Sequence, residues 1–363
     1  MPASGHWRAQ RDYREGSAGV GRYRGRAVVF VRPRRAEVHD DVLFPAMNDE
    51  SVVIRTAYSV ISRGTELDLY TNQMHTRGER GQWYPLLPGY MPCGEVVEAG
   101  SKVSHLRVGD RAIASNLFGG FDERYCCAWG GHCEYIVVGP ESHPWHGARR
   151  ALKVPREIAS EHAALAVLGA VALHGIEAKV RPQEGETVLV VGQGVIGNFA
   201  AQLCKASGAR VIVADLEESR LAVSRTCGIE ETIDASQNAL ATAVAELTNG
   251  RGPEAVIDVT GDPRVLESLL PIAGSYGRIH AQGMYLEAVS LYFPETLFGR
   301  NLTLSSTCGE QPEHAARVLE HMASGSLTYK LLLSDVMPVH AAGDAYERVH
   351  CRPGDVMTVA LKW

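Results

Sequence analysis

The residues with the most specific chemical pattern form a glycine-rich run, GQGVIG, at positions 192–197, directly after the apolar run TVLVV. Gly192 permits a tight turn, Gly194 lets a pyrophosphate approach the backbone, and Gly197 lets the following helix pack against the strand. The start of that helix offers free N–H groups and a partial positive charge to phosphates. The spacing predicts a dinucleotide site, and we expect Val195 and Ile196 to contact the cofactor as well.

An acidic residue supports this prediction and bears on the choice of cofactor. Asp215 ends the next strand-like run, where a carboxylate accepts hydrogen bonds from the adenosine ribose. A carboxylate there repels a 2′-phosphate, so NAD(H) is favoured over NADP(H). Arg220, five residues further on, softens that preference and leaves NADP(H) possible. We also place Gly283, at the end of the run GRIHAQG, among the cofactor-binding residues.

The pattern of apolar and turn residues changes near Pro182. From Ala27 to about residue 150, short apolar runs such as RAVVFV and CGEVVEAG alternate with turn residues, which is typical of strands in a barrel-like domain. After Pro182, short buried strands alternate with amphipathic helices, and Gly208 and Gly228 follow two of these helices as C′ residues. This alternation predicts a parallel sheet covered on both faces.

The predicted fold class is therefore α/β, with a barrel-like, mainly-β catalytic domain and a doubly wound parallel-sheet domain of the Rossmann type. We assign residues 1–26 to a flexible N-terminal extension and residues 27–178 with 311–363 to the catalytic domain. Residues 179–310 form the dinucleotide-binding domain.

Composition excludes several classes of function. The 363 residues carry a net charge of −6, which argues against nucleic-acid binding through a basic face. No apolar run approaches the ~18 residues of a membrane span. The first 26 residues lack the apolar segment of a signal peptide, although an Arg-rich transit peptide is an alternative. Eight dispersed cysteines are typical of reduced thiols, so we expect a cytoplasmic protein.

Four features of the chain together point to a known family. They are the run EVVEAGSKVSHLRVGDRA at residues 95–112, the tripeptide LHG at 173–175, the glycine loop and Asp215. Over residues 27–363 the chain resembles the medium-chain dehydrogenase/reductase superfamily. The resemblance implies a GroES-like catalytic domain, a nicotinamide cofactor held between two domains, a small-molecule substrate and a homo-oligomer. The apolar segment at residues 291–301 is either a subunit contact or part of the core.

Zinc-dependent members of this superfamily hold a catalytic zinc through a thiolate, an imidazole and a third ligand on a later helix. The corresponding positions here are Ser62, Tyr90 and about Val167. Neutral hydroxyls and a valine do not hold Zn²⁺. A second, structural zinc would need four suitably spaced cysteines, and the region after Asp110 offers a poorly spaced set instead. That set is Cys126, Cys127, His132 and Cys133. We therefore expect no metal site.

The segment Ile-Ser-x-Gly-Thr-Glu at residues 61–66 is similar to a zinc-lacking branch of the superfamily, which includes bacteriochlorophyllide hydroxyethyl dehydrogenases. Without zinc, a hydroxyl donor must stabilise the developing oxyanion.

Tyr90 is the leading candidate for this donor, against the alternative that it only fills space. Thr65 and Ser62 are candidates for the same role, although a turn hydroxyl often bonds its own backbone. Glu66 would orient a donor unless it is a solvated charge, and Arg63 would reach the cofactor pyrophosphate. We interpret His132 as structural, and likewise the histidine of the LHG tripeptide.

Three functions fit this pattern. The favoured one is a zinc-independent, NAD(H)-dependent alcohol dehydrogenase or ketone reductase acting on a secondary hydroxyl of a sugar-like, cyclitol-like or specialised metabolite. Its polar substrate is inferred from the side chains that gather between residues 62 and 76, which are Ser62, Arg63, Thr65, Glu66, Asn72 and His75. The alternatives are a quinone or enoyl reductase acting on a C=C bond, and an inactive dinucleotide-binding protein.

Overall fold

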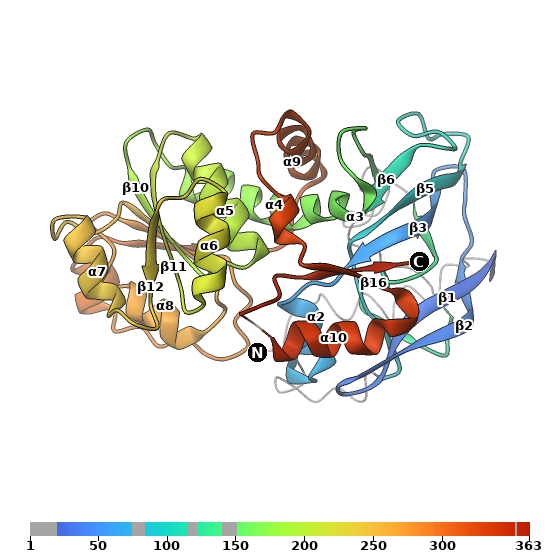
Figure 1. Ribbon diagram of the computed structural model, residues 1–363, viewed down its shortest axis with the longest axis horizontal. Helices are drawn as coiled ribbons and strands as arrows, with labels where there is room; N and C mark the ends of the chain where they lie inside the picture. The colour runs from blue at the N-terminus through green and yellow to red at the C-terminus, as the bar shows by residue number, and fades with distance from the viewer. Residues whose placement is uncertain (1–19, 75–83, 115–121, 140–150, 353) are drawn as a thin grey trace.

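The computed structural model describes residues 20–74, 84–114, 122–139, 151–352 and 354–363. These residues form two lobes, with helices α4 (Leu165–Gly175) and α9 (Pro312–Ser324) lying between them (Figure 1). The predicted extension at residues 1–26 falls largely outside the described residues. The last part of this segment belongs to strand β1 (Val20–Arg32). Within β1, Arg24 forms an ion pair with Asp41 on the neighbouring strand.

One lobe contains a six-stranded parallel sheet in the order β12-β11-β10-β13-β14-β15. Its strands are β10 (Thr187–Val191), β11 (Arg210–Asp215), β12 (Glu231–Asp234), β13 (Ala255–Asp258), β14 (Arg278–Ala281) and β15 (Thr303–Ser306). The connecting helices are α5 (Val195–Ala206), α6 (Glu218–Thr226), α7 (Leu240–Leu247), α8 (Pro263–Leu269) and the π-helical turn η5 (Pro294–Phe298).

Both faces of this sheet are covered, as the sequence predicts. Val188 and Val190 of β10 pack with α5, whereas Leu189 and Val191 pack with α7 and α8. Because alternate side chains of a strand point to opposite faces, each central strand needs a nearly continuous apolar run. The predicted helix ends are confirmed by Gly208, which has a left-handed φ of 84° directly after α5.

The other lobe contains two sheets, which are mostly antiparallel. A seven-stranded sheet has the order β16-β17-β3-β5-β6-β9, with β8 paired to β3, and a four-stranded sheet has the order β2-β1-β4-β7. The strands of the first are β3 (Val52–Val60), β5 (Pro92–Ala99), β6 (Arg111–Ala114), β8 (Tyr135–Val138), β9 (Ala151–Lys153), β16 (Asp335–Pro338) and β17 (Val359–Lys362). Those of the second are β1, β2 (Arg35–Pro45), β4 (Leu86–Leu87) and β7 (Cys126–Cys127). Side chains from both sheets share one apolar core, which gives the lobe its barrel-like form.

The end of the chain returns to this lobe. Strands β16 and β17 extend the sheet beside β3, and α10 (Ala342–Cys351) lies against it. Short helices complete the fold: α2 (Thr65–Tyr70), α3 (Ser160–Ala163), η4 (Ile176–Val180), η6 (Lys330–Leu332) and η7 (Val339–Ala341).

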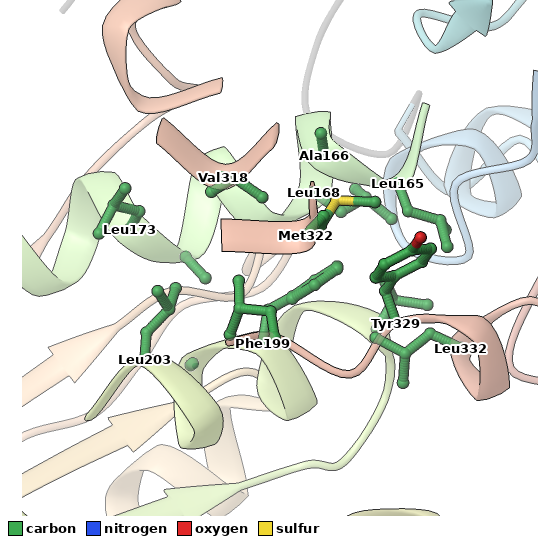
Figure 2. Packing of buried hydrophobic residues seen from close by; sticks show 14 of the residues in the cluster. Leu165, Ala166, Leu168, Leu173, Phe199, Leu203, Val318, Met322, Tyr329 and Leu332 are labelled. Atoms are coloured by element: carbon green, nitrogen blue, oxygen red, sulfur yellow. The ribbon is translucent and has the colours of Figure 1, made fainter. Parts of the chain in front are cut away.

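Helix α4 joins the lobes through an apolar core. Leu168 and Leu173 of α4 pack with Phe199 of α5 and with Val318 of α9 (Figure 2). Residues 160–180 have the length and composition of a membrane-crossing helix, but 72% of their most apolar window is buried inside the protein. That burial identifies the segment as a core helix.

Candidate active site

The predicted glycine loop lies between β10 and α5, at the carboxyl edge of the parallel sheet. Gly192 has a left-handed φ of 92°, and a Cβ on Gly197 would collide with the carbonyl oxygen of Gly192. Gly194 is the N-cap of α5, and a Cβ built there meets no atom within 4 Å. The loop is therefore closely packed on the protein side and open at Gly194, which fits the approach of a pyrophosphate.

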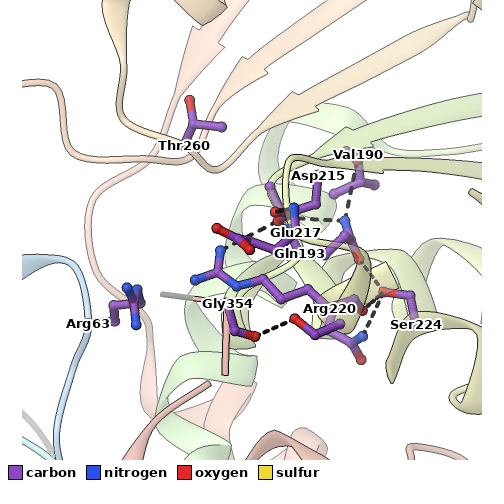
Figure 3. A network of polar contacts seen from close by, with 12 residues as sticks. Arg63, Val190, Gln193, Asp215, Glu217, Arg220, Ser224, Thr260 and Gly354 are labelled. Carbon is purple, nitrogen blue, oxygen red and sulfur yellow. Dashed lines mark hydrogen bonds and ion pairs between the residues drawn. The ribbon is translucent and has the colours of Figure 1, made fainter. Parts of the chain in front are cut away.

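Asp215 ties this loop to the next one. Its Oδ2 accepts a hydrogen bond from the backbone N–H of Gln193 at 2.5 Å, and its Oδ1 accepts one from the N–H of Glu217 at 2.9 Å. Arg220 approaches the same carboxylate at 3.5 Å (Figure 3). The two βα loops thus meet at the position predicted to read the adenosine ribose.

Arg63 faces this group from the catalytic lobe (Figure 3). Its guanidinium donates to the carbonyl of Val356 at 3.1 Å. Burial and the nearby charge of Arg220 lower the pKa of Arg63 to about 10, while Asp215 and Glu217 act in the opposite direction. The side chain therefore lies near Asp215 and Arg220, and its predicted contact with the cofactor pyrophosphate stays a prediction.

Two further contacts shape the cofactor side. The Ser219 hydroxyl donates to the carbonyl of Gly354, which joins the two lobes next to Asp215. At the end of β14, a Cβ on Gly283 would lie 2.5 Å from the backbone nitrogen of Gly261. Gly283 is thus needed for close packing of two strand ends at the sheet edge that carries the glycine loop.

The predicted hydroxyl donors gather at one point of the catalytic lobe. The phenol of Tyr90 donates to Ser62 Oγ at 2.6 Å, and Ser62 precedes helix α2, which begins at Thr65. Burial and the negative charge of Glu66 raise the pKa of Tyr90 well above its ordinary value, and hydrogen bonding to Ser62 and Thr65 only partly offsets this. The phenol of Tyr90 is therefore protonated and neutral at neutral pH.

Glu66 is fully buried, so it is not a solvated charge. Its carboxylate accepts three hydrogen bonds: from the Ser62 backbone N–H at 3.0 Å, from His132 Nε2 at 2.9 Å and from the Tyr346 hydroxyl at 2.5 Å. A buried carboxylate is tolerated when hydrogen bonds replace its lost water. Glu66 thus links the segment of Ser62 to two distant parts of the chain.

Sequence reasoning missed several of these partners. His132, Tyr346 and Trp363 lie far from residues 62–66 in the sequence, and no spacing pattern joins them. Ser59 is close in sequence, but its contacts with His132 and Trp363 leave no pattern either. Glu310 was also missed. It is buried in the loop after β15, and its charge contributes to the raised pKa of Tyr90.

The donor set does not fit a catalytic zinc. Ser62 and Tyr90 are hydrogen-bonded to each other, and Val167 is buried in the apolar core. Across the described ranges, no group of three or more His, Cys, Asp or Glu side chains could hold a metal ion. Cys126 and Cys127 form the short strand β7.

His75, one of the predicted polar side chains, lies outside the described residues.

Comparison with known proteins agrees with both lobes. Residues 48–148 match the alcohol dehydrogenase GroES-like domain family, and residues 195–324 match the zinc-binding dehydrogenase family. The chain is 30% identical over 323 residues to 2-desacetyl-2-hydroxyethyl bacteriochlorophyllide A dehydrogenase of Cereibacter sphaeroides, which covers 88% of this chain and 92% of that protein. It is 23% identical to D-arabitol-phosphate dehydrogenase of Enterococcus avium over 332 residues, or 85% of this chain and 89% of that protein.

A solved structure has the same fold. It is an Escherichia coli protein described as a short-chain alcohol dehydrogenase, complexed with the cofactor NADH. Its TM-score to this chain is 0.79 at 21% identity, covering 95% of this chain and all of that chain. With a GroES-like domain and a Rossmann dinucleotide-binding domain, the chain belongs to the medium-chain dehydrogenase/reductase superfamily and is an oxidoreductase of that class.

Proposed function

We propose that this protein is a zinc-independent oxidoreductase that transfers hydride between NAD(H) and a secondary alcohol or ketone of a polar substrate. The observation that carries the proposal is the hydrogen bond from Tyr90 to Ser62. It brings together a phenol and a hydroxyl from the two segments that, by resemblance, correspond to metal-ligand segments of zinc-dependent members of the superfamily. Bound nicotinamide would supply the hydride, and the protein must then supply or remove the proton.

Tyr90 is suited to donate that proton. Its raised pKa keeps the phenol neutral, so it can donate a hydrogen bond to a carbonyl oxygen that becomes negatively charged during reduction. In the resting site this hydrogen bond goes to Ser62. With substrate bound, the phenol would donate to the substrate oxygen, and the Ser62 hydroxyl would donate to the phenol oxygen and keep it in place. General acid help of this kind typically contributes about 10²–10⁴-fold to the rate. Ser62 and Thr65 would then stabilise the phenolate that remains, through hydrogen bonds to its oxygen.

The preference for NAD(H) rests on Asp215. Its carboxylate is held by two backbone N–H groups at the ribose position, where it would accept bonds from ribose hydroxyls and repel a 2′-phosphate. Arg220 and Arg63 bring two positive charges to the same place, so NADP(H) is the weaker but still possible cofactor.

A polar substrate is supported by the site and by the relatives. Ser62, Thr65 and Glu310 add polar groups beside Tyr90. The two relatives compared above are named as dehydrogenases of a hydroxyethyl-bearing pigment and of a sugar-alcohol phosphate. A secondary hydroxyl on a sugar-like, cyclitol-like or specialised metabolite fits both observations.

We further propose a cytoplasmic homo-oligomer. All eight cysteines are free thiols, which suits a reducing compartment. Strand β15 is an edge of the parallel sheet, and next to it Tyr292, Phe293 and Phe298 are exposed. Exposed aromatic patches of this kind mark interaction surfaces, and a second copy of the chain would cover this one. The molar mass in solution tests this assignment.

The experiment is a turnover panel with the unaltered protein. Sugar alcohols, cyclitols, ketones and enones are offered with each nicotinamide cofactor, and Asp215→Ala serves as the matched variant. We expect turnover of alcohols and ketones with NAD(H), and improved use of NADPH by Asp215→Ala. Robust reduction of enones with NADPH by the unaltered protein would identify a C=C reductase instead. Tight NADH binding without any turnover would identify an inactive dinucleotide-binding protein.

A further inference from the structure

Glu66 and His132 form a fully buried pair next to the proposed proton donor. Both side chains have no exposed surface, and Glu66 Oε2 lies 2.9 Å from His132 Nε2. The other described donors to this carboxylate are the Ser62 N–H and the Tyr346 hydroxyl. Since a buried carboxylate depends on all of its partners, each donor also determines where the carboxylate points.

The direction of the hydrogen bonds around His132 follows from Glu66. An ionised carboxylate only accepts, so His132 Nε2 carries a proton and donates it to Glu66 Oε2 at 2.9 Å. In a neutral imidazole Nδ1 then has no proton and accepts from the Ser59 hydroxyl, which lies 2.8 Å away. Ser59 Oγ in turn accepts from Trp363 Nε1 at 2.9 Å.

The backbone around His132 is joined to the backbone around Tyr90. The N–H of Gly131 donates to the carbonyl of Gly89 at 2.6 Å, and the N–H of His132 donates to that of Pro88 at 3.2 Å. A Cβ on Gly89 would lie 2.5 Å from His132 Cδ2, and one on Gly131 would lie 2.6 Å from the nitrogen of Tyr90. The two glycines thus let the imidazole and the Tyr90 segment pack directly against each other.

We propose that His132 is a positioning residue for the reaction described under Proposed function, on which this inference rests. His132 Nε2–H holds the Glu66 carboxylate, Glu66 holds the backbone of Ser62, and Ser62 Oγ receives the hydrogen bond that aims the Tyr90 phenol. His132 does not touch the substrate. Its role is to fix the direction of the phenol from two sides, through Glu66 and through the packing of its ring against Gly89, the residue before Tyr90.

The test compares His132→Leu, which removes both ring nitrogens, with His132→Gln, which keeps an N–H donor of similar reach. Thr56→Val is the matched control, because Thr56 Oγ1 donates at 2.6 Å to the carbonyl of the adjacent Cys133 and is equally enclosed. We expect His132→Leu to lower kcat about ten- to a hundredfold, as misplacement of a reacting group does, with KM and NADH affinity unchanged. His132→Gln should restore most of kcat, and Thr56→Val should leave it unaltered.

Two measurements do not depend on turnover. Nitrogen-15 NMR of labelled histidines in the unaltered protein should show His132 with a proton on Nε2 and none on Nδ1. Amide exchange should show a protected Ser62 N–H that loses protection in His132→Leu and keeps it in His132→Gln. If His132→Leu does not fold, the role of His132 is still tested by the tautomer of the unaltered protein and by the turnover and Ser62 amide protection of His132→Gln.

The outcomes separate the two proposals. Turnover that depends on Tyr90 but is unchanged in His132→Leu would overturn the role of His132 and leave the proposed function intact. An Nε2 without a proton, or a Ser62 amide as well protected in His132→Leu as in the unaltered protein, would also overturn it. Absence of any turnover in the unaltered protein would contradict the proposed function, while the tautomer and the Ser62 amide would still test the positioning chain.

Discussion

The phenol of Tyr90, which the sequence resemblance predicts to take the place of a zinc-binding imidazole, donates to Ser62 at 2.6 Å. The sequence predicted these two residues, Thr65 and Glu66 as one group because all belong to segments that align with metal-site segments of the superfamily. The sequence could not predict the residues that hydrogen-bond to Glu66 and to its partner histidine. His132, Tyr346 and Trp363 carry no local pattern, since polar side chains that satisfy one another across the fold leave no periodicity in the sequence.

The raised pKa of Tyr90 leads to a prediction for the pH dependence of ketone reduction. An ordinary tyrosine loses half of its protons at about pH 10. Burial and the charge of Glu66 raise the pKa of Tyr90 above that value, so its phenol stays protonated as pH rises through this range. We expect kcat for reduction to show no loss from phenol ionisation up to about pH 10. The check is the steady-state kcat for ketone reduction, measured as a function of pH across this range.

A decline of kcat below about pH 9 that disappears in Tyr90→Phe would mean that the phenol ionises readily. Such a profile would contradict the effect of burial and of Glu66 on this residue.

At the scale of elements, the sequence predicted the central strands and the helices that position the cofactor loop. Strands β10 and β11 are buried on both faces and consist of continuous apolar runs, and Gly208 follows the C-cap residue of α5. The edge strands β12 and β15 were not predicted. Each has one neighbour only and mixes polar with apolar residues, for example in Glu231–Asp234, so neither periodicity nor an apolar run marks it.

The glycine loop gives a prediction with a built-in control. Gly194→Ala adds a Cβ that meets no protein atom within 4 Å, and its φ of −68° suits alanine. We expect it to fold with an unchanged midpoint of thermal unfolding but to bind NADH at least about tenfold more weakly, because the methyl group points to where the pyrophosphate approaches. Gly197→Ala should instead lower the free energy of unfolding by about 1–3 kcal/mol, since its Cβ collides with the Gly192 carbonyl.

Calorimetry of unfolding and NADH fluorescence titration measure the two quantities separately. Full NADH affinity in Gly194→Ala would show that the cofactor does not approach the backbone at this loop.

At the scale of the whole molecule, the site is assembled from segments far apart in the chain. Tyr346 on α10 reaches Glu66, and Arg63 reaches Val356 just before the last strand. The sequence predicted that residues 311–363 return to the catalytic domain, and β16 and β17 do extend its sheet. It could not predict how the returning segment holds Arg63 near Asp215 and Arg220, because a family motif does not reveal that contact, and the predicted pyrophosphate contact of Arg63 stays a prediction.

Each lobe is held by its own apolar core, and α4 packs between the two lobes. Glu66 accepts hydrogen bonds from Ser62, His132 and Tyr346 and so joins three segments of the catalytic lobe.

The central claim is that a phenol performs the proton transfer for which related enzymes use zinc. The most direct measurement is kcat for ketone reduction by Tyr90→Phe and by the unaltered protein, both treated with chelator and checked for metal content. We predict that the unaltered protein keeps its turnover without zinc and that Tyr90→Phe loses about 10²–10⁴-fold in kcat while it binds NADH normally. Unchanged turnover in Tyr90→Phe, or activity that falls with chelation and returns with zinc, would contradict the account.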